Sequence, residues 1–103
     1  MIGGIADEHW QRIVAVFRKH PNITDVILYG SRAKGNFREG SDIDLAVKGT
    51  NIQSEQLTQI DMDYEDLYLP WQFDVRLYDT IRNEALKAHI DHVGISLLAL
   101  PCG

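Results

Sequence analysis

The residues with the clearest chemical potential are three aspartates, Asp42, Asp44 and Asp74. Asp42 and Asp44 lie two positions apart in a segment of alternating apolar residues, so both side chains point to the same face of a strand. Asp74 lies on the polar face of a second alternating segment. Two ionised carboxylates about 4 Å apart repel by roughly 4 kcal/mol at an effective dielectric of 20. A divalent cation removes this repulsion, and Mg²⁺ suits the site because it combines one or two carboxylates with water and phosphate oxygens.

The pair Gly30-Ser31 follows an apolar segment and precedes Asp42 by ten intervening residues. Glycine permits a tight turn, and the first amides of a turn that enters a helix are unpaired and carry positive partial charge. By itself, Gly-Ser is an ordinary turn, and paired aspartates can protect a strand edge from aggregation. Together, these residues predict a phosphate-binding turn beside two metal-binding carboxylates, which is a site for a nucleoside triphosphate and Mg²⁺.

Several cations lie close to these residues. Arg32, Lys34 and Arg38 can contact a triphosphate or remain solvated. Arg76 shares the predicted face of Asp74, where it can either reach phosphate or pair with the aspartates. The histidines have no metal-ligand spacing and are predicted to be surface residues; they are His9, His20, His89 and His92.

Hydrophobic periodicity predicts the elements that position these residues. Helical spacing indicates helices over residues 6–19, 53–69 and 81–92. Apolar or alternating residues indicate strands over 26–29, 42–48 and 73–78, with a closing strand over 95–98. Residues 30–40 are predicted to form a polar loop with one helical turn after Ser31. The pattern predicts one α/β domain over residues 1–103, with three or four strands and helices that cover them.

Composition narrows the function. The chain has 103 residues and a formal net charge of −5, which argues against direct binding of nucleic acid. Its single cysteine, Cys102, can form no internal disulfide. No segment has the pattern of a signal peptide or the length of a membrane span. A cytoplasmic location is therefore expected.

Taken together, these motifs resemble a known family. The segments Gly30-Ser31-Arg32-Ala33-Lys34-Gly35 and Ser41-Asp42-Ile43-Asp44-Leu45, with the later Asp74, are similar to the polymerase-beta-like nucleotidyltransferases, and in particular to the minimal nucleotidyltransferases. The resemblance implies a small mixed β-sheet flanked by helices. It also implies nucleotide-binding roles for four residues, and these are Gly30, Ser31, Arg32 and Ser41.

The resemblance further implies a reaction. Asp42, Asp44 and Asp74 would hold two Mg²⁺ and act in catalysis, with Asp74 as the acceptor of a proton from the attacking hydroxyl. ATP would be the substrate. Minimal members act with a helical HEPN partner; in the MntA-like antitoxins, the transferase moves AMP from ATP onto a tyrosine of that partner, a toxic RNase, and silences it.

Two other functions stay open at this point. The chain can be the catalytic subunit of an enzyme that nucleotidylates a small molecule with the help of a separate substrate-binding subunit. Alternatively, it can be a regulator that blocks its partner sterically without turnover, although such a binder has little need for crowded carboxylates.

Overall fold

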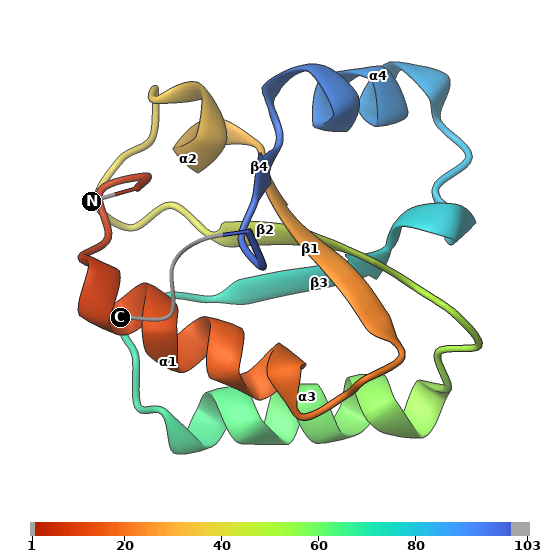
Figure 1. The fold of residues 1–103 in the computed structure, drawn as a ribbon. Coiled ribbons are helices and arrows are strands. Elements are labelled where there is room, and N and C mark those ends of the chain that lie inside the picture. Colours follow the sequence, from red (N-terminus) through yellow and green to blue (C-terminus); the bar gives the residue numbers. More distant parts are fainter. Residues whose placement is uncertain (1, 100–103) are drawn as a thin grey trace.

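The computed structural model describes residues 2–99 and shows a four-stranded sheet between two layers of helices (Figure 1). Cys102 lies outside the described residues. The helices are α1 (Asp7–Arg18), α2 (Ser31–Lys34), α3 (Ser54–Asp66) and α4 (Glu84–Val93), with a 3₁₀ turn, η1 (Tyr78–Thr80). The strands are β1 (Ile23–Tyr29), β2 (Ile43–Gly49), β3 (Phe73–Leu77) and β4 (Ile95–Ser96).

The sheet is mixed, with the strand order β3-β2-β1-β4. β1 pairs with β2 and with β4 in antiparallel orientation, whereas β2 and β3 are parallel. A parallel pair needs a crossover connection, and α3 supplies it between β2 and β3. β2 is therefore flanked by β1 and β3, and its side chains have neighbours on two strands.

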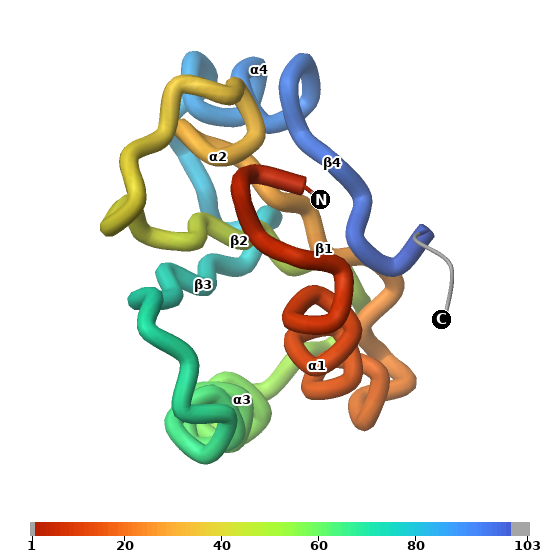
Figure 2. Tube along the Cα trace, turned by 90° about the vertical axis from the view of Figure 1, so that its left-hand side faces the viewer, coloured from red at the N-terminus to blue at the C-terminus, as the bar shows by residue number. Residues whose placement is uncertain are grey.

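One face of the sheet carries the larger core. The residues Ile43, Leu45 and Val47 alternate along β2 and point to the layer of α1 and α3, which lies below the sheet in Figures 1 and 2. Trp10 and Phe17 of α1 are fully buried there, as the sequence predicts. Because this face is filled by large apolar side chains, it fixes the register of β2 and sends the alternate residues, including Asp44, to the opposite face.

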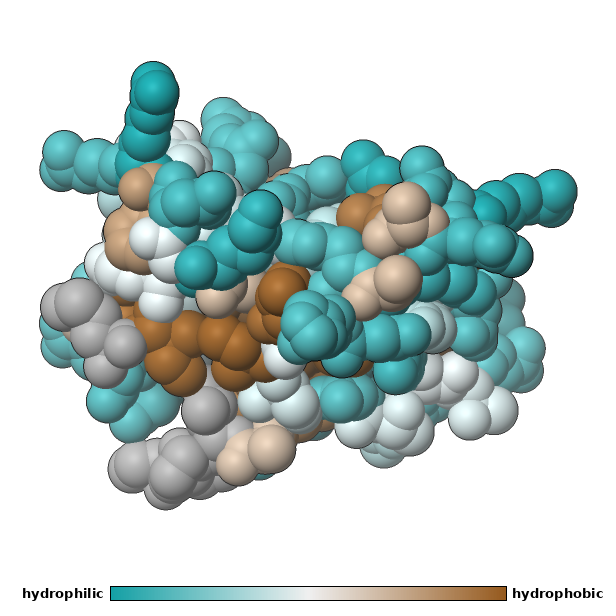
Figure 3. Space-filling model, turned by 90° about the horizontal axis from the view of Figure 1, so that it is seen from above, coloured by the Kyte–Doolittle hydropathy of each residue, from teal (hydrophilic) through white to brown (hydrophobic). Residues whose placement is uncertain are grey.

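The opposite face carries a smaller core under α4. Ile27, Tyr29 and Ala46 of the sheet pack with Ile81 and Ile90. Figure 3, which views the molecule from the α4 side, shows a surface that is mostly hydrophilic, with an apolar area exposed between the polar groups. α4 covers only part of this face, so polar side chains at the end of the sheet keep access to solvent.

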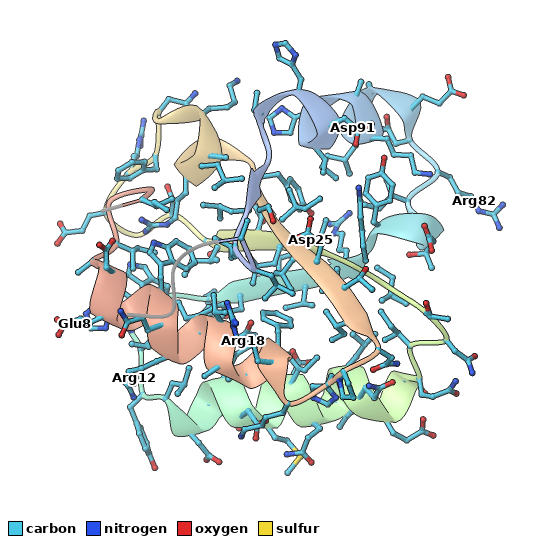
Figure 4. All side chains as sticks on the ribbon, viewed as in Figure 1. Glu8, Arg12, Arg18, Asp25, Arg82 and Asp91 are labelled. Carbon is cyan, nitrogen blue, oxygen red and sulfur yellow. The ribbon has the colours of Figure 1, made fainter. Side chains whose placement is uncertain are left out.

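The short β4 is fixed by a polar contact. Ser96 Oγ donates a hydrogen bond of 2.6 Å to Asp25 Oδ1, and the same oxygen accepts the Val26 N–H at 2.9 Å. Figure 4 shows Asp25 between β1 and β4. This contact ties the end of the described chain to the strand that leads into the Gly30 turn.

The predicted elements are confirmed in type and order, with differences at their ends. β1 begins at Ile23 rather than at residue 26, because Ile23 is buried and pairs with Gly49. α3 ends at Asp66, since Tyr68 adopts a left-handed conformation before Pro70 is reached. α4 begins at Glu84, where the Asn83 side chain caps it, and not at residue 81. β4 is shorter than residues 95–98.

Within residues 2–99 no helix has the length and hydrophobicity to cross a membrane.

Two residues of α3 give a direct test of the core. We expect Ile60→Ala to lower the free energy of unfolding by about 3 kcal/mol, because the side chain is completely buried between the helices and the sheet. Met62→Ala is the matched control, because Met62 is 55% exposed on the same helix and its truncation should cost less than about 0.5 kcal/mol. Urea denaturation measures both, and equal losses would contradict the observed orientation of α3.

Candidate active site

Asp44 lies at the centre of the polar groups. In the register of the sheet it is the partner of Tyr29 on β1 and of Asp74 on β3, so strand pairing alone brings the two aspartates side by side. Asp42 is exposed and lies just before β2. Burial raises the pKa of Asp44 above its usual range, and the charges of Asp74 and Asp42 raise it further. The structure thus brings the three predicted carboxylates to one end of the sheet, where their negative charges interact.

The predicted phosphate-binding turn lies against this carboxylate. Gly30 follows β1 with φ of 76° and ψ of −155°, a backbone conformation that L side chains rarely adopt. A Cβ atom at this position would lie far inside van der Waals contact of Asp44 Oδ2. The backbone angle therefore favours glycine at this position, and any other residue would also displace the Asp44 carboxylate.

Ser31 is the first residue of α2, a single helical turn that the sequence predicts. Lys34 N–H donates to Gly30 O at 3.1 Å and Gly35 N–H donates to Ser31 O at 2.9 Å. The first amides of such a turn have no partner within the helix. Ser31 is half-buried and begins the turn directly beside Gly30, next to Asp44.

Arg32 has a structural role that the sequence did not reveal. It is 3% exposed, and its guanidinium donates to three backbone carbonyls: Ser41 O at 3.0 Å, Gly3 O at 2.7 Å and Glu39 O at 3.1 Å. Its charge also lies over the rings of Phe37 and Trp71, with 5.2 and 5.7 Å from Cζ to the ring centroids. Arg32 thus stabilises the loop between α2 and β2 through these hydrogen bonds. A contact of this side chain with nucleotide stays a prediction.

Ser41 holds the same loop from the other side. Its hydroxyl oxygen accepts the Arg38 N–H at 2.8 Å, and its own N–H donates to Arg38 O at 2.9 Å. These two bonds close the turn directly before Asp42. Nucleotide binding by Ser41 stays a prediction, while its contacts show that it shapes the approach to β2.

Of the two possibilities for Arg76, the structure shows the ion pair. Arg76 Nη2 lies 3.3 Å from Asp74 Oδ2, and this hydrogen bond raises the pKa of the arginine. Both side chains keep substantial solvent exposure, so the pair offsets part of the local negative charge without closing the site. Lys34 and Arg38 are exposed, as expected for solvated loop cations.

Three of the four histidines predicted to be surface residues are only partly exposed, and each of these makes a contact with a distant segment. His89 of α4 is half-buried, and its Nε2 accepts the Gly30 N–H at 3.1 Å. His9 is half-buried edge-on against Trp71, and His20 lies 3.0 Å from Gln56 Nε2. Local sequence carries no signal for these contacts, because each depends on packing between segments far apart in the chain. His92 is exposed as predicted.

Within residues 2–99, no group of three or more His, Cys, Asp or Glu side chains is arranged to hold a metal ion. The donor set still suits a hard cation of the Mg²⁺ type, which needs only one or two carboxylates from the protein. Asp44 is the clearest such donor, because it is partly buried and lies beside Asp74 in the sheet; burial first, and then the charges of Asp74 and Asp42, raise its pKa. The arrangement can bind a cation and phosphate oxygens side by side.

The family model for polymerase beta nucleotidyltransferases matches residues 11–99. The chain therefore belongs to the polymerase beta nucleotidyltransferase family, in agreement with the mixed sheet and the resemblance of its motifs. No curated protein matches the sequence significantly.

The fold is similar to that of solved structures of toxin-antitoxin proteins. A toxin-antitoxin crystallised with AMP-PNP matches with a TM-score of 0.70 and 20% identity over 85% of this chain and 71% of that chain. A mutant of the toxin-antitoxin MntA-HpeT matches with a TM-score of 0.68 and 17% sequence identity, over 85% of this chain and 70% of that chain. The third structure is a complex of a tri-AMPylated HEPN toxin of Shewanella oneidensis with an MNT antitoxin. It matches with a TM-score of 0.64 and 17% sequence identity, over 89% of this chain and 71% of that chain. These likenesses show a shared fold.

The close approach of Gly30 to Asp44 can be tested with two alanine variants. In Gly30→Ala the new residue must adopt an unfavourable positive φ, and its Cβ lies too close to the Asp44 carboxylate. We therefore expect the free energy of unfolding to fall by about 2–4 kcal/mol. Gly35→Ala has a similar φ of 89° but open space around the new Cβ, and should lose only about 1 kcal/mol. Thermal and urea unfolding measure both; equal losses would mean that Asp44 does not crowd position 30.

The raised pKa of Asp44 predicts a pH-dependent stability difference. The folded state binds the Asp44 proton more tightly than the unfolded state, so stability falls as pH rises from the ordinary value of 3.8 through the raised pKa. We therefore expect metal-free Asp44→Asn to have a higher Tm than the wild type at pH 7. The difference should shrink as the pH falls below about 4.

Asp79→Asn is the control, since Asp79 is exposed on η1. A gain from Asp44→Asn that stays constant over the whole pH range would argue against charge as its cause.

Proposed function

We propose that this chain is a Mg²⁺-dependent adenylyltransferase that moves AMP from ATP onto a tyrosine hydroxyl of a HEPN-type partner toxin, and so acts as the antitoxin. The observation that carries the proposal is the pairing of Asp44 with Asp74 in the sheet, beside a turn at Gly30 whose backbone passes close to the Asp44 carboxylate. The proposed place of action is the cytoplasm, where ATP is available.

The similar solved structures support this choice of nucleotide and partner. One of them contains AMP-PNP, and another contains an AMPylated HEPN toxin with its antitoxin. The MntA-HpeT mutant replaces two aspartates two positions apart by glutamate, the same spacing as Asp42 and Asp44 here. This spacing supports the assignment of Asp42 and Asp44 as the pair that matters for the reaction.

Each residue has a defined part in the proposed reaction. Ser31 and the backbone amides that follow Gly30 bind the β- and γ-phosphates, because the first amides of α2 have no partner within the helix. Asp42 and Asp44 hold Mg²⁺, with Asp74 as a further ligand for a second ion. Bound Mg²⁺ supplies charge neutralisation of the triphosphate. Arg32 and Ser41 shape the loop through their backbone contacts, and their direct binding to nucleotide is part of the proposal.

The chemical step is a substitution at the α-phosphorus. The acceptor hydroxyl oxygen forms a bond to the α-phosphorus, the bond to the oxygen that bridges the α- and β-phosphates breaks, and pyrophosphate leaves. Asp74 accepts the hydroxyl proton; it is suited to this because it lies beside Asp44 on the neighbouring strand. The contribution of the protein is mainly to position the groups and to balance their charge.

The test is transfer of AMP from ATP labelled at the α-phosphate to the product of the adjacent gene, purified as the candidate partner. We expect labelled partner with the wild type and Mg²⁺, and at least about a hundredfold less label with Asp42→Asn or Asp44→Asn, because the remaining carboxylates cannot replace the metal-binding pair. EDTA should abolish the label. Digestion with mass spectrometry identifies the modified residue.

Asp61→Asn is the matched control, because Asp61 is exposed on α3 and belongs to the layer below the sheet. It should transfer AMP at the wild-type rate. A stable complex without label would favour a steric regulator, and label on an added small molecule but not on the protein would favour the alternative of a subunit that modifies small molecules.

A further inference from the structure

We propose that His89 is a positioning residue for nucleotide binding, which acts by holding the backbone of the turn at Gly30. The inference rests on the proposed function, because that function places phosphates at this turn. His89 touches backbone and a neighbouring ring in the described structure, so its effect on the nucleotide is transmitted through Gly30.

The contact joins two segments that are 59 residues apart in sequence. His89 lies on α4, and its Nε2 accepts the Gly30 N–H at a distance of 3.1 Å in a partly buried environment. Its ring stands edge-on to Tyr29, with 6.3 Å between ring centroids and 80° between planes. In a neutral imidazole one nitrogen accepts and the other carries the proton, so this contact places the proton on Nδ1.

Gly30 is the position where such a contact matters most. The pairing of β1 with β2 ends at Tyr29 opposite Asp44, so the Gly30 N–H is the first donor beyond that ladder. A partly buried donor without a partner is costly, and glycine has no side chain to restrict its backbone. His89 satisfies this donor and holds the peptide between Tyr29 and Gly30 in one orientation.

The next peptide along the chain, between Gly30 and Ser31, carries the Gly30 carbonyl and the Ser31 N–H, and it is joined to the peptide held by His89 through the φ and ψ of Gly30. The Gly30 carbonyl accepts the Lys34 N–H and so closes α2. Ser31 begins α2 at the next position, and its amide belongs to the proposed phosphate-binding group. If the peptide between Tyr29 and Gly30 loses its fixed orientation, the φ and ψ of Gly30 are less restricted, and the Ser31 amide in the next peptide is held less firmly toward the phosphate. His89 is therefore expected to act on nucleotide affinity through the turn.

Two substitutions separate the hydrogen bond from the packing. His89→Gln keeps an acceptor oxygen near the position of Nε2 but has no ring, whereas His89→Phe keeps a ring against Tyr29 but has no acceptor. His92→Phe is the control, because His92 is exposed on the same helix. Binding of AMP-PNP with Mg²⁺, without any acceptor, is measured by isothermal titration calorimetry, and thermal unfolding shows which variants fold.

We expect the Kd of His89→Gln and His92→Phe to lie within about twofold of the wild type, and that of His89→Phe to rise about tenfold, the upper range for one lost hydrogen bond. The Gly30 amide in a ¹H–¹⁵N spectrum gives a readout independent of nucleotide. Its proton should move upfield and exchange faster in His89→Phe, and keep its position in His89→Gln.

The outcomes are distinct. Equal nucleotide affinity in all variants overturns the role of His89, and equal weakening in His89→Gln and His89→Phe assigns the effect to ring packing and also overturns it. A wild type that binds no nucleotide overturns the proposed function, and the role of His89 in nucleotide binding with it. If the His89→Phe variant does not fold, His89→Gln remains as the test. A loss of nucleotide affinity in His89→Gln, with the resonance of the Gly30 amide unchanged, would contradict the proposal.

Discussion

At the end of β1 the backbone of Gly30 passes so close to the Asp44 carboxylate that a side chain cannot fit between them. This contact follows from strand pairing, because Tyr29 and Asp44 are partners in the antiparallel ladder and the next residue must turn away. The turn has three supports: the positive φ of Gly30, the His89 acceptor on its N–H, and the Lys34 donor on its carbonyl. The beginning of α2, and with it the proposed phosphate contacts, is placed relative to Asp44 by these supports.

The ionised Asp44 carboxylate opposes folding, because it is partly buried and lies beside other acidic groups. The pKa of Asp44 is raised by burial and by its acidic neighbours, and Arg76 offsets only part of the charge through its exposed pair with Asp74. The opposite face compensates, because β2 buries Ile43 and Leu45 completely against α1 and α3. The free energy gained by burying this apolar face thus offsets the cost of the polar groups on the other face. Active sites are commonly stabilised in this way by the core beside them.

The order of elements was predictable because each helix and strand carries its own periodicity, and alternation in β2 assigned Asp44 to the polar face correctly. The neighbours of Asp44 were not predictable from local pattern, since nothing in residues 42–48 or 73–78 states that the two strands are parallel and adjacent. Arg32 was predicted to bind nucleotide as a polar-loop cation, yet long-range contacts bury it among backbone carbonyls. His89 has no distinguishing neighbours in sequence, and its contact with Gly30 exists only when α4 packs on β1.

The carbonyls that Arg32 binds belong to Gly3, Glu39 and Ser41, so its guanidinium joins the segment before α1 to the loop before β2. None of these bonds lies within a helix or a strand ladder. The bonds to Glu39 and Ser41 span only 7 and 9 residues, whereas the bond to Gly3 spans 29 residues. Removing this one side chain would therefore leave three backbone carbonyls without their donor, in the segment before α1 and in the loop that leads into Asp42. The shape of the loop beside the carboxylates thus depends on residues that precede the first helix.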